Sequence, residues 1–393
     1  MEAKLEPVAK KVKQEDWCED GAGHAQSGEN VDPGQPATDR FRATNLYDRQ
    51  IRLWGWDAQQ RLMKSKLLMY GLDGVGAEVL KNLMLGGIRQ ITIMDWQIAA
   101  ESDLTTNFFL RRQDVGQLNR ATATAERAKS LNITCALTAM EAQTSDVTVD
   151  LVKDYDLVVL NGVSHQEAVR IGNACRILGI PIFLSQICGF HAFFANDLNG
   201  LKFEIPPLKS FQPGNTAKTQ SSRASLPSTS SGKRDNKELK LMGSSQGESC
   251  EIQELTISSP DLSVVLDVKA VRRSGLASPV PRRGYGLKKM DPYLNLELIL
   301  TFAGRKGRYP TYGHSEDDFK DLKHVLAEIR PEGDSRVVEP EEMVTAEANF
   351  TCAILGGTLA QEVITVLTRR NYPIYNLYYL AANDACGSRE YVE

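Results

Sequence analysis

The sequence has no pair of cysteines at the CxxC spacing of zinc ribbons and thioredoxin-type redox sites. Its 7 cysteines are scattered through 393 residues, which favours buried thiols in a reducing compartment over a disulfide framework. The amino terminus has no apolar run of the kind found in secretory signals, so we expect no secretion. A formal net charge of −4 excludes a chain that is basic throughout, and we expect no nucleic-acid partner.

Long hydrophobic runs are also scarce. The stretch 177–196 carries no charge, but a proline, a glycine, a histidine and a Ser-Gln pair interrupt it. Their clustering favours two buried strands joined by a turn over a membrane-spanning helix. We therefore expect no membrane partner.

Composition divides the chain into four segments. Residues 1–40 are polar, and residues 207–262 are rich in Ser, Thr, Gly and Lys. Both segments are predicted to be disordered, because they hold too few apolar groups to offset the entropy of ordering. Residues 41–206 and 263–393 then form two parts of one domain. The insert is basic; Lys233–Lys240 could serve as a nuclear address, although a solvated loop is the simpler interpretation.

Strands that alternate with helices predict an α/β Rossmann-like fold, with a mainly parallel sheet covered on both faces. Expected strands lie at residues 66–70, 90–94, 133–137, 157–160, 181–184 and 375–380. Expected helices lie at residues 77–85, 120–131, 147–153, 165–178, 293–302, 317–329 and 350–368.

A glycine-rich turn with Gly71, Gly74 and Gly76 follows the first strand. In nucleotide-binding folds such a turn lets phosphate approach the free N–H groups at a helix start, and Asp95 at the tip of the next strand is placed to accept ribose hydroxyls. Asp73 interrupts the motif, because it replaces the second glycine and would repel phosphate. The turn is therefore either a degenerate nucleotide site or a packing feature.

Several motifs in order resemble the ubiquitin-like-protein activating enzymes of the ThiF superfamily. They are Tyr47–Gly55 (YDRQIRLWG), Lys81–Leu83 with Gly86–Ile88, and Ala360–Glu362. Within the superfamily, the chain resembles the small subunits of SUMO-activating enzymes. The resemblance implies a ThiF-type adenylation fold and a heterodimer. Its catalytic large subunit would bind ATP and magnesium, adenylate SUMO, hold most of the SUMO contacts and capture SUMO on a cysteine.

Departures from the active members fit the non-catalytic subunit. Thr106 stands where active members carry an arginine that grips phosphate, and no carboxylate lies at Val163–Ser164, where the resemblance places the magnesium aspartate. No cysteine matches a thioester-forming motif; Cys250 lies within the insert. The resemblance therefore implies a subunit that holds no cofactor or metal and is inactive alone.

The resemblance assigns a role to Arg49. In the family, the arginine after Tyr-Asp reaches across the dimer interface to the nucleotide phosphates in the partner's site, and Arg52 has a weaker claim to that role. A helix here would dock Tyr47, Ile51 and Trp54 together and leave both arginines on its outer side. A guanidinium suits the task because it is always charged and binds phosphate as a fixed fork.

Two alternatives remain open at this stage. The chain could be a self-sufficient homodimeric adenylyltransferase like the bacterial sulfur-carrier activators, although the arginine and the acid of that reaction are absent here. It could also be a Rossmann protein that binds NAD, against which Asp73 and the Tyr47–Gly55 motif argue. We expect the protein in the nucleus and also in the cytoplasm.

Overall fold

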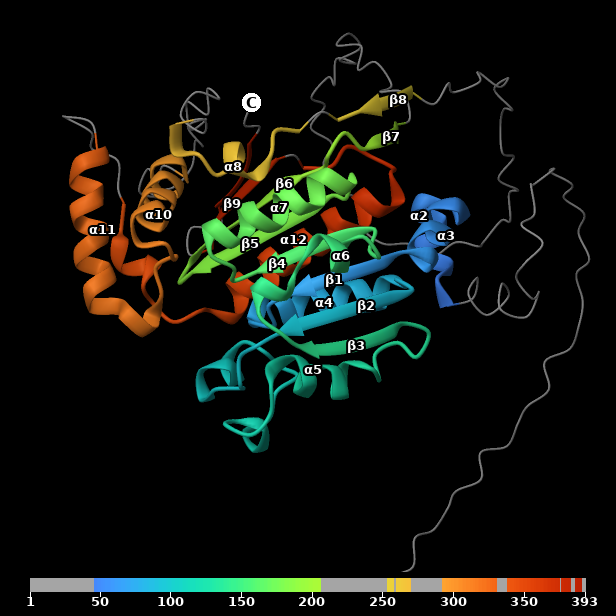
Figure 1. Ribbon diagram of the computed structural model, residues 1–393, viewed down its shortest axis with the longest axis horizontal. Coiled ribbons are helices and arrows are strands. Elements are labelled where there is room, and N and C mark those ends of the chain that lie inside the picture. Colours follow the sequence, from blue (N-terminus) through green and yellow to red (C-terminus); the bar gives the residue numbers. More distant parts are fainter. Residues whose placement is uncertain are drawn as a thin grey trace, which may run out of the picture. The chain divides into compact units, whose positions relative to one another are not determined.

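A mixed sheet lies at the centre of the computed structural model, and Figure 1 shows helices on both of its faces. The strand order among the described residues is β10-β9-β6-β5-β4-β1-β2-β3. From β3 to β5 all neighbours are parallel, whereas β6, β9 and β10 continue the sheet in antiparallel pairs. The predicted α/β Rossmann-like fold with a mainly parallel sheet is confirmed.

The structure describes residues 46–205, 253–257, 259–269, 292–330, 338–374, 376–382 and 386–390. The predicted tail 1–40, Cys250 and Lys233–Lys240 lie outside these ranges, as does most of the predicted insert. From Tyr47 on, the chain forms one compact unit.

The strands are short and mostly apolar. They are β1 (Lys66–Tyr70), β2 (Gln90–Asp95), β3 (Ala136–Glu141), β4 (Leu157–Asn161), β5 (Ile182–Cys188), β6 (His191–Asp197), β9 (Leu377–Ala381) and β10 (Cys386–Glu390). A separate antiparallel ribbon pairs β7 (Lys202–Ile205) with β8 (Gln253–Thr256). The end of the predicted insert, residues 253–262, thus contains β8, which pairs with the chain on the other side of the gap.

Helices connect the strands and complete the fold. They are α2 (Asp48–Trp54), α3 (Trp56–Lys64), α4 (Gly74–Gly86), α5 (Arg120–Ala128), α6 (Val149–Val152), α7 (His165–Leu178), α8 (Leu262–Val265), α10 (Pro292–Lys306), α11 (Ser315–Ile329) and α12 (Asn349–Thr368). Short 3-10 turns lie at Glu101–Thr105, Arg112–Asp114, Thr144–Asp146, Tyr312–His314 and Pro340–Met343.

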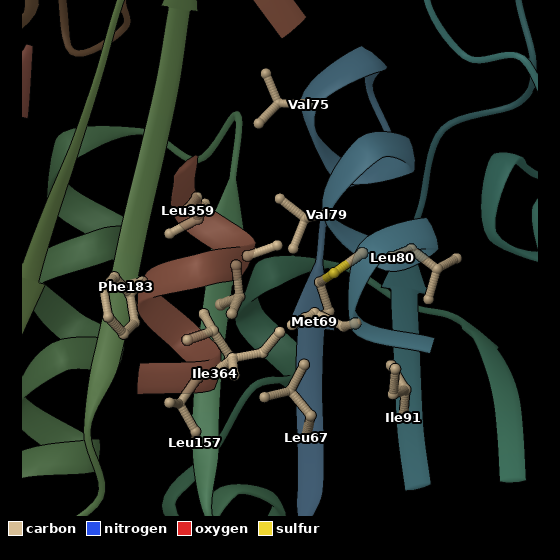
Figure 2. Close-up of a cluster of buried hydrophobic side chains, with 14 of the residues drawn as sticks. Leu67, Met69, Val75, Val79, Leu80, Ile91, Leu157, Phe183, Leu359 and Ile364 are labelled. Carbon is tan, nitrogen blue, oxygen red and sulfur yellow. The ribbon is translucent and has the colours of Figure 1, made fainter. Parts of the chain in front are cut away.

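The sheet separates two hydrophobic cores. On one face, α4, α5 and α12 pack over the strands, and Figure 2 shows Leu359 and Ile364 of α12 in the same cluster as Leu67 of β1, Leu157 of β4 and Phe183 of β5. On the other face, α7, α8, α10 and α11 cover Leu68, Leu160 and Leu184. Burial of this apolar area, at about 25 cal/mol per Å², is the main force that holds the layers together.

Helix α12 is the one described helix that is long and apolar enough to cross a membrane. It is also 67% buried over its most apolar window, and it packs closely against α4. Gly356 permits this contact, because a Cβ there would lie 2.6 Å from the Cβ of Glu78. The glycine inside the helix is therefore a packing residue, and α12 is a core helix of this fold.

The expected elements agree with most of the structure. β1 and α7 have the predicted bounds, and residues 177–196 contain β5, a turn and β6, as expected. The strand predicted at 133–137 is present but begins later than expected, because β3 runs from Ala136 to Glu141. The Asn132 side-chain oxygen accepts hydrogen bonds from the backbone N–H and the hydroxyl of Thr134, and this local turn replaces the first residues of the expected strand.

Candidate functional site

A cavity of about 630 Å³ lies at the carboxyl ends of the parallel strands. Tyr70, Asp95, Asn161 and Gln186 line it from the ends of β1, β2, β4 and β5. The chain runs outward from β1 to β3 and then crosses over β1 to β4, so the cavity lies at the topological switch point of the sheet. Open α/β sheets bind their ligands in this place.

The three glycines of the turn are all required by packing. Gly71 has a φ of +88°, and a Cβ there would lie 2.1 Å from the carbonyl oxygen of Asn161. A Cβ on Gly76 would lie 2.1 Å from the Gly71 oxygen, and one on Gly74 would lie 2.5 Å from the Cβ of Thr106. Close packing between strand, turn and helix is sufficient to explain these glycines, with or without a bound phosphate.

Asp73 occupies the place at the helix start that a phosphate would take in a working nucleotide site. It is the N-cap of α4, and its carboxylate accepts a hydrogen bond of 2.8 Å from the Gly76 N–H. Burial raises the pKa of this carboxyl above its ordinary value, although the Gly76 bond opposes the shift. The anion-binding donors of α4 are thus engaged by the protein's own carboxylate.

Asp95 is bound internally rather than free for a ribose. It is 1% exposed, and its carboxylate accepts hydrogen bonds from the Leu72 N–H at 2.8 Å and from Nη2 of Arg120 at 2.8 Å. Burial alone would lower the pKa of Arg120, but Asp95, Asp103 and Asp73 outweigh it and raise that pKa. The role of Asp95 in the structure is therefore to hold the loop between β2 and α5 through a buried ion pair.

The two positions that depart from active members also serve the fold. Thr106 is 7% exposed and packs against Gly74. Ser164 is the N-cap of α7, and Glu167, the acid nearest to it in sequence, pairs with Arg170 at 2.8 Å. In the part of the chain that the structure describes, no group of three His, Cys, Asp or Glu side chains could hold a metal ion.

Three cavity residues had no place in the sequence prediction. Glu347 precedes α12 and faces the cavity; burial, followed by the Asp73 carboxylate, raises its pKa to about 8. Gln186 is 7% exposed, and its side chain makes no hydrogen bond to another described residue. The Tyr70 hydroxyl is buried and is also without a hydrogen-bond partner in the described ranges. No sequence motif marks these positions, because α12 and β5 meet only in the folded chain.

At the opposite edge of the sheet, α2 presents Arg49. Tyr47, the N-cap of this helix, is 4% exposed and its hydroxyl accepts a hydrogen bond from Asn132. Trp54 packs on the core and donates to Gln59, whereas Ile51 is half-buried. The expected docking face is thus present.

The two arginines of α2 differ in their surroundings. Arg52 is paired with Asp48 at 3.0 Å, and both side chains are largely exposed. Arg49 is exposed and has no hydrogen bond or ion pair with another residue of the described ranges. Its guanidinium is therefore available to an external anion.

Helices α2 and α3 lie beside the start of β1 in Figure 1, away from the carboxyl ends of the strands. β1 has 5 residues, which at about 3.3 Å each separates the two edges by about 17 Å. Arg49 consequently cannot reach the cavity of its own chain. A second cavity of about 490 Å³ lies at this amino edge, lined by Arg61, Lys64 and Arg369 among others.

The described cysteines fit the sequence prediction of buried thiols. Cys135, Cys175, Cys188 and Cys352 are buried and form no disulfide. Burial raises the pKa of Cys135 to about 11 and that of Cys175 to about 12. Such thiols are poor nucleophiles at neutral pH, so neither Cys135 nor Cys175 is suited to carry a thioester.

The family model of the "ThiF family" matches residues 47–390. The chain belongs to the ThiF family. It is similar to "SUMO-activating enzyme subunit 1" of Rattus norvegicus, with 29% identity over 345 residues that cover 85% of this chain and 89% of the rat protein. The Homo sapiens protein of that name is 29% identical over 344 residues (85% and 90%), and the Danio rerio protein is 29% identical over 354 residues (88% and 93%). The resemblance to ThiF-type adenylating proteins is thus confirmed at the level of the family.

Proposed function

We propose that this chain is the non-catalytic subunit of a heterodimeric SUMO-activating enzyme. Its partner, the catalytic large subunit, would bind ATP and magnesium, adenylate SUMO, hold most of the SUMO contacts and capture SUMO as a thioester. The similarity to proteins named "SUMO-activating enzyme subunit 1" over most of both chains supports this assignment.

The observation that carries the proposal is the contrast between the chain's cavity and Arg49. The cavity holds Asp73 where phosphate would bind and a buried Asp95–Arg120 pair where ribose would bind. Arg49 lies at the other edge, exposed and without a partner in the described residues. A fold whose own carboxylate caps the helix start of its glycine turn, and which presents an exposed guanidinium, is suited to complete a nucleotide site in another subunit.

In this reaction Arg49 would act in trans. A cross-subunit guanidinium would stabilise negative charge on the triphosphate and on the leaving pyrophosphate as the acyl-phosphate bond forms. Arg52, bound to Asp48, would orient the helix rather than contact the nucleotide. We further propose that the complex works in the nucleus and also in the cytoplasm.

The test is ATP–pyrophosphate exchange dependent on SUMO. The chain alone should give no exchange above background, and addition of the large subunit should restore it. Robust exchange by the chain alone would favour the homodimeric adenylyltransferase. Failure of the two subunits to form a complex in gel filtration would contradict the heterodimer, and bound NAD in the purified chain would favour the NAD-binding alternative.

A further inference from the structure

The cavity at the carboxyl edge carries more negative than positive charge. Its lining includes four acids, Asp73, Asp95, Glu167 and Glu347, and two arginines. Asp95 is neutralised by Arg120 and Glu167 by Arg170, while the second arginine of the lining, Arg308, is bound by Asp318 at 2.6 Å.

Two carboxyl groups are left over after these pairs are formed. Asp73 and Glu347 form no ion pair with any residue in the described ranges, and Arg120 near them is already committed to Asp95. A ligand that carries negative charge would oppose the ionisation of these two carboxyls, whereas a cation would favour it and be attracted to the ionised forms. The charge balance therefore selects for a positively charged ligand.

Unsatisfied polar groups in the same cavity point to a ligand. Gln186 lines the cavity and is 7% exposed. Its side chain makes no hydrogen bond to a described residue. Tyr70, which is 5% exposed, has a buried hydroxyl without a partner among those residues. Buried polar atoms are nearly always hydrogen-bonded in folded proteins, so these two side chains mark a place for a hydrogen-bonding group.

The walls suit an aliphatic chain next to the charge. Trp96, which is 56% exposed, lines the cavity together with Ile187 and Pro310. Aromatic and aliphatic walls bind methylene groups, and an indole face also attracts an adjacent cation. The described residues contain no group of three or more His, Cys, Asp or Glu side chains that could hold a metal ion.

We propose that this cavity binds an aliphatic ammonium group, as carried by a polyamine or a lysine side chain, between Asp73 and Glu347. The inference goes beyond the proposed function and does not rest on it, because it concerns a site within this chain alone. An ammonium has three N–H donors, which the two carboxyls and the Gln186 side-chain oxygen can accept. The class of ligand expected here is thus the opposite of the anionic nucleotide for which this fold is known.

Binding should release a proton. The pKa of Glu347 is raised to about 8, so this carboxyl holds its proton near neutral pH in the empty cavity; burial also raises the pKa of Asp73. An ammonium between the two groups would favour their ionised forms and so lower their pKa values. Arg120 already lowers the pKa of Glu347, whereas Asp103 raises it. The heat of binding should consequently depend on the ionisation enthalpy of the buffer.

The experiment is isothermal titration calorimetry of the full chain with spermidine and, separately, with Nα-acetyl-lysine methylamide, whose side-chain ammonium is free. We expect saturable one-to-one binding of at least one probe; the stronger probe identifies the source of the ammonium. Glu347→Gln and Asp73→Asn should each weaken binding by about ten- to a hundredfold, and Glu347→Gln should remove most of the proton release. Asparagine remains a good N-cap, so Asp73→Asn should keep α4 intact, and the melting temperature checks this.

The matched control is Asp150→Asn on α6. It makes the same change of charge at an acid that is 91% exposed and outside the cavity, so the affinity for the probe should be unchanged. Absence of binding by both amines, equal affinities of wild type and Glu347→Gln, or binding of ATP or Mg²⁺ in the cavity as tight as that of the amines would each overturn the proposal.

Discussion

The two edges of the parallel strands differ in how their charged groups are used. At the carboxyl edge, Asp95 and Arg120 neutralise each other, and the remaining acids Asp73 and Glu347 face the cavity. At the amino edge, Arg49 is exposed and unpaired within the described residues. Both edges belong to one fold in which packing is sufficient to explain the glycine turn, so the chemistry of an edge can change while the scaffold stays the same.

The largest effect should come from breaking the neutralised pair at the carboxyl edge. Arg120→Met leaves Asp95, which is 1% exposed, without its counter-ion. Removal of one partner of a buried pair costs about 3 to 5 kcal/mol, and the bonds from Leu72 and Gln97 to Asp95 place our expectation at the lower end. Urea unfolding of the full chain measures the loss.

The double variant Arg120→Met/Asp95→Asn serves as its control. It removes the unpaired charge together with the arginine, so much of the stability should return if the cost is electrostatic. Equal stabilities of wild type and Arg120→Met would contradict the structural role of the pair.

Arg49→Ala tests the other edge. Arg49 contributes no core packing, since its side chain is exposed, so assembly with the large subunit should be intact. The loss of a preorganised charge at the phosphates should slow SUMO adenylation by about a hundredfold or more, equivalent to about 2.7 to 4 kcal/mol. Arg49→Lys keeps the charge but loses the fork and should be intermediate. Single-turnover adenylation by heterodimers measures the rates.

Comparable rates of wild type and Arg49→Ala would refute the trans role of this arginine. Dissociation of the variant heterodimer in gel filtration would instead assign Arg49 to the subunit interface. Either result would remove the functional contrast between the two edges.

Local sequence was sufficient for most of the fold and for part of the site. The apolar run of β1, the helix α7 and the glycine turn are encoded by neighbouring residues, and these elements were predicted. β3 was displaced because Ile133, an apolar residue read as strand, is 92% exposed in a turn. When an apolar residue follows an Asn that favours a turn, the local sequence does not show whether a strand or a turn will form.

The cavity itself could not be read from the sequence. The sequence left open whether Asp95 serves a degenerate nucleotide site or the packing of the fold; in the structure Arg120, which lies 25 positions later, binds its carboxylate. The Asp73 carboxylate influences Glu347, which lies more than 270 positions later in the sequence, because α12 packs against α4 in the folded chain. Contacts between residues far apart in sequence decide which charges are free, and periodicity and motifs carry no information about them.

The pH dependence of the melting temperature tests the charge state of Glu347 at the carboxyl edge. A carboxyl with a raised pKa binds its proton more tightly in the folded chain than in the unfolded chain, so its contribution to stability is greatest below about pH 4.5 and is lost as the pH rises towards about 8. Glu347→Gln, which cannot ionise, should therefore show a smaller fall of melting temperature between pH 5 and pH 8 than wild type. Parallel curves for the two proteins would contradict the raised pKa.

The smallest effect is expected for Arg52→Ala, three positions from Arg49 on the same helix. Its ion pair with Asp48 joins side chains that are 77% and 48% exposed, and exposed pairs of this spacing contribute about 0.5 kcal/mol or less. Both the melting temperature and the single-turnover adenylation rate should stay close to wild type. If Arg52→Ala slowed adenylation as much as Arg49→Ala, the guanidinium that acts at the partner's phosphates would be that of Arg52, released from Asp48 when the subunits meet.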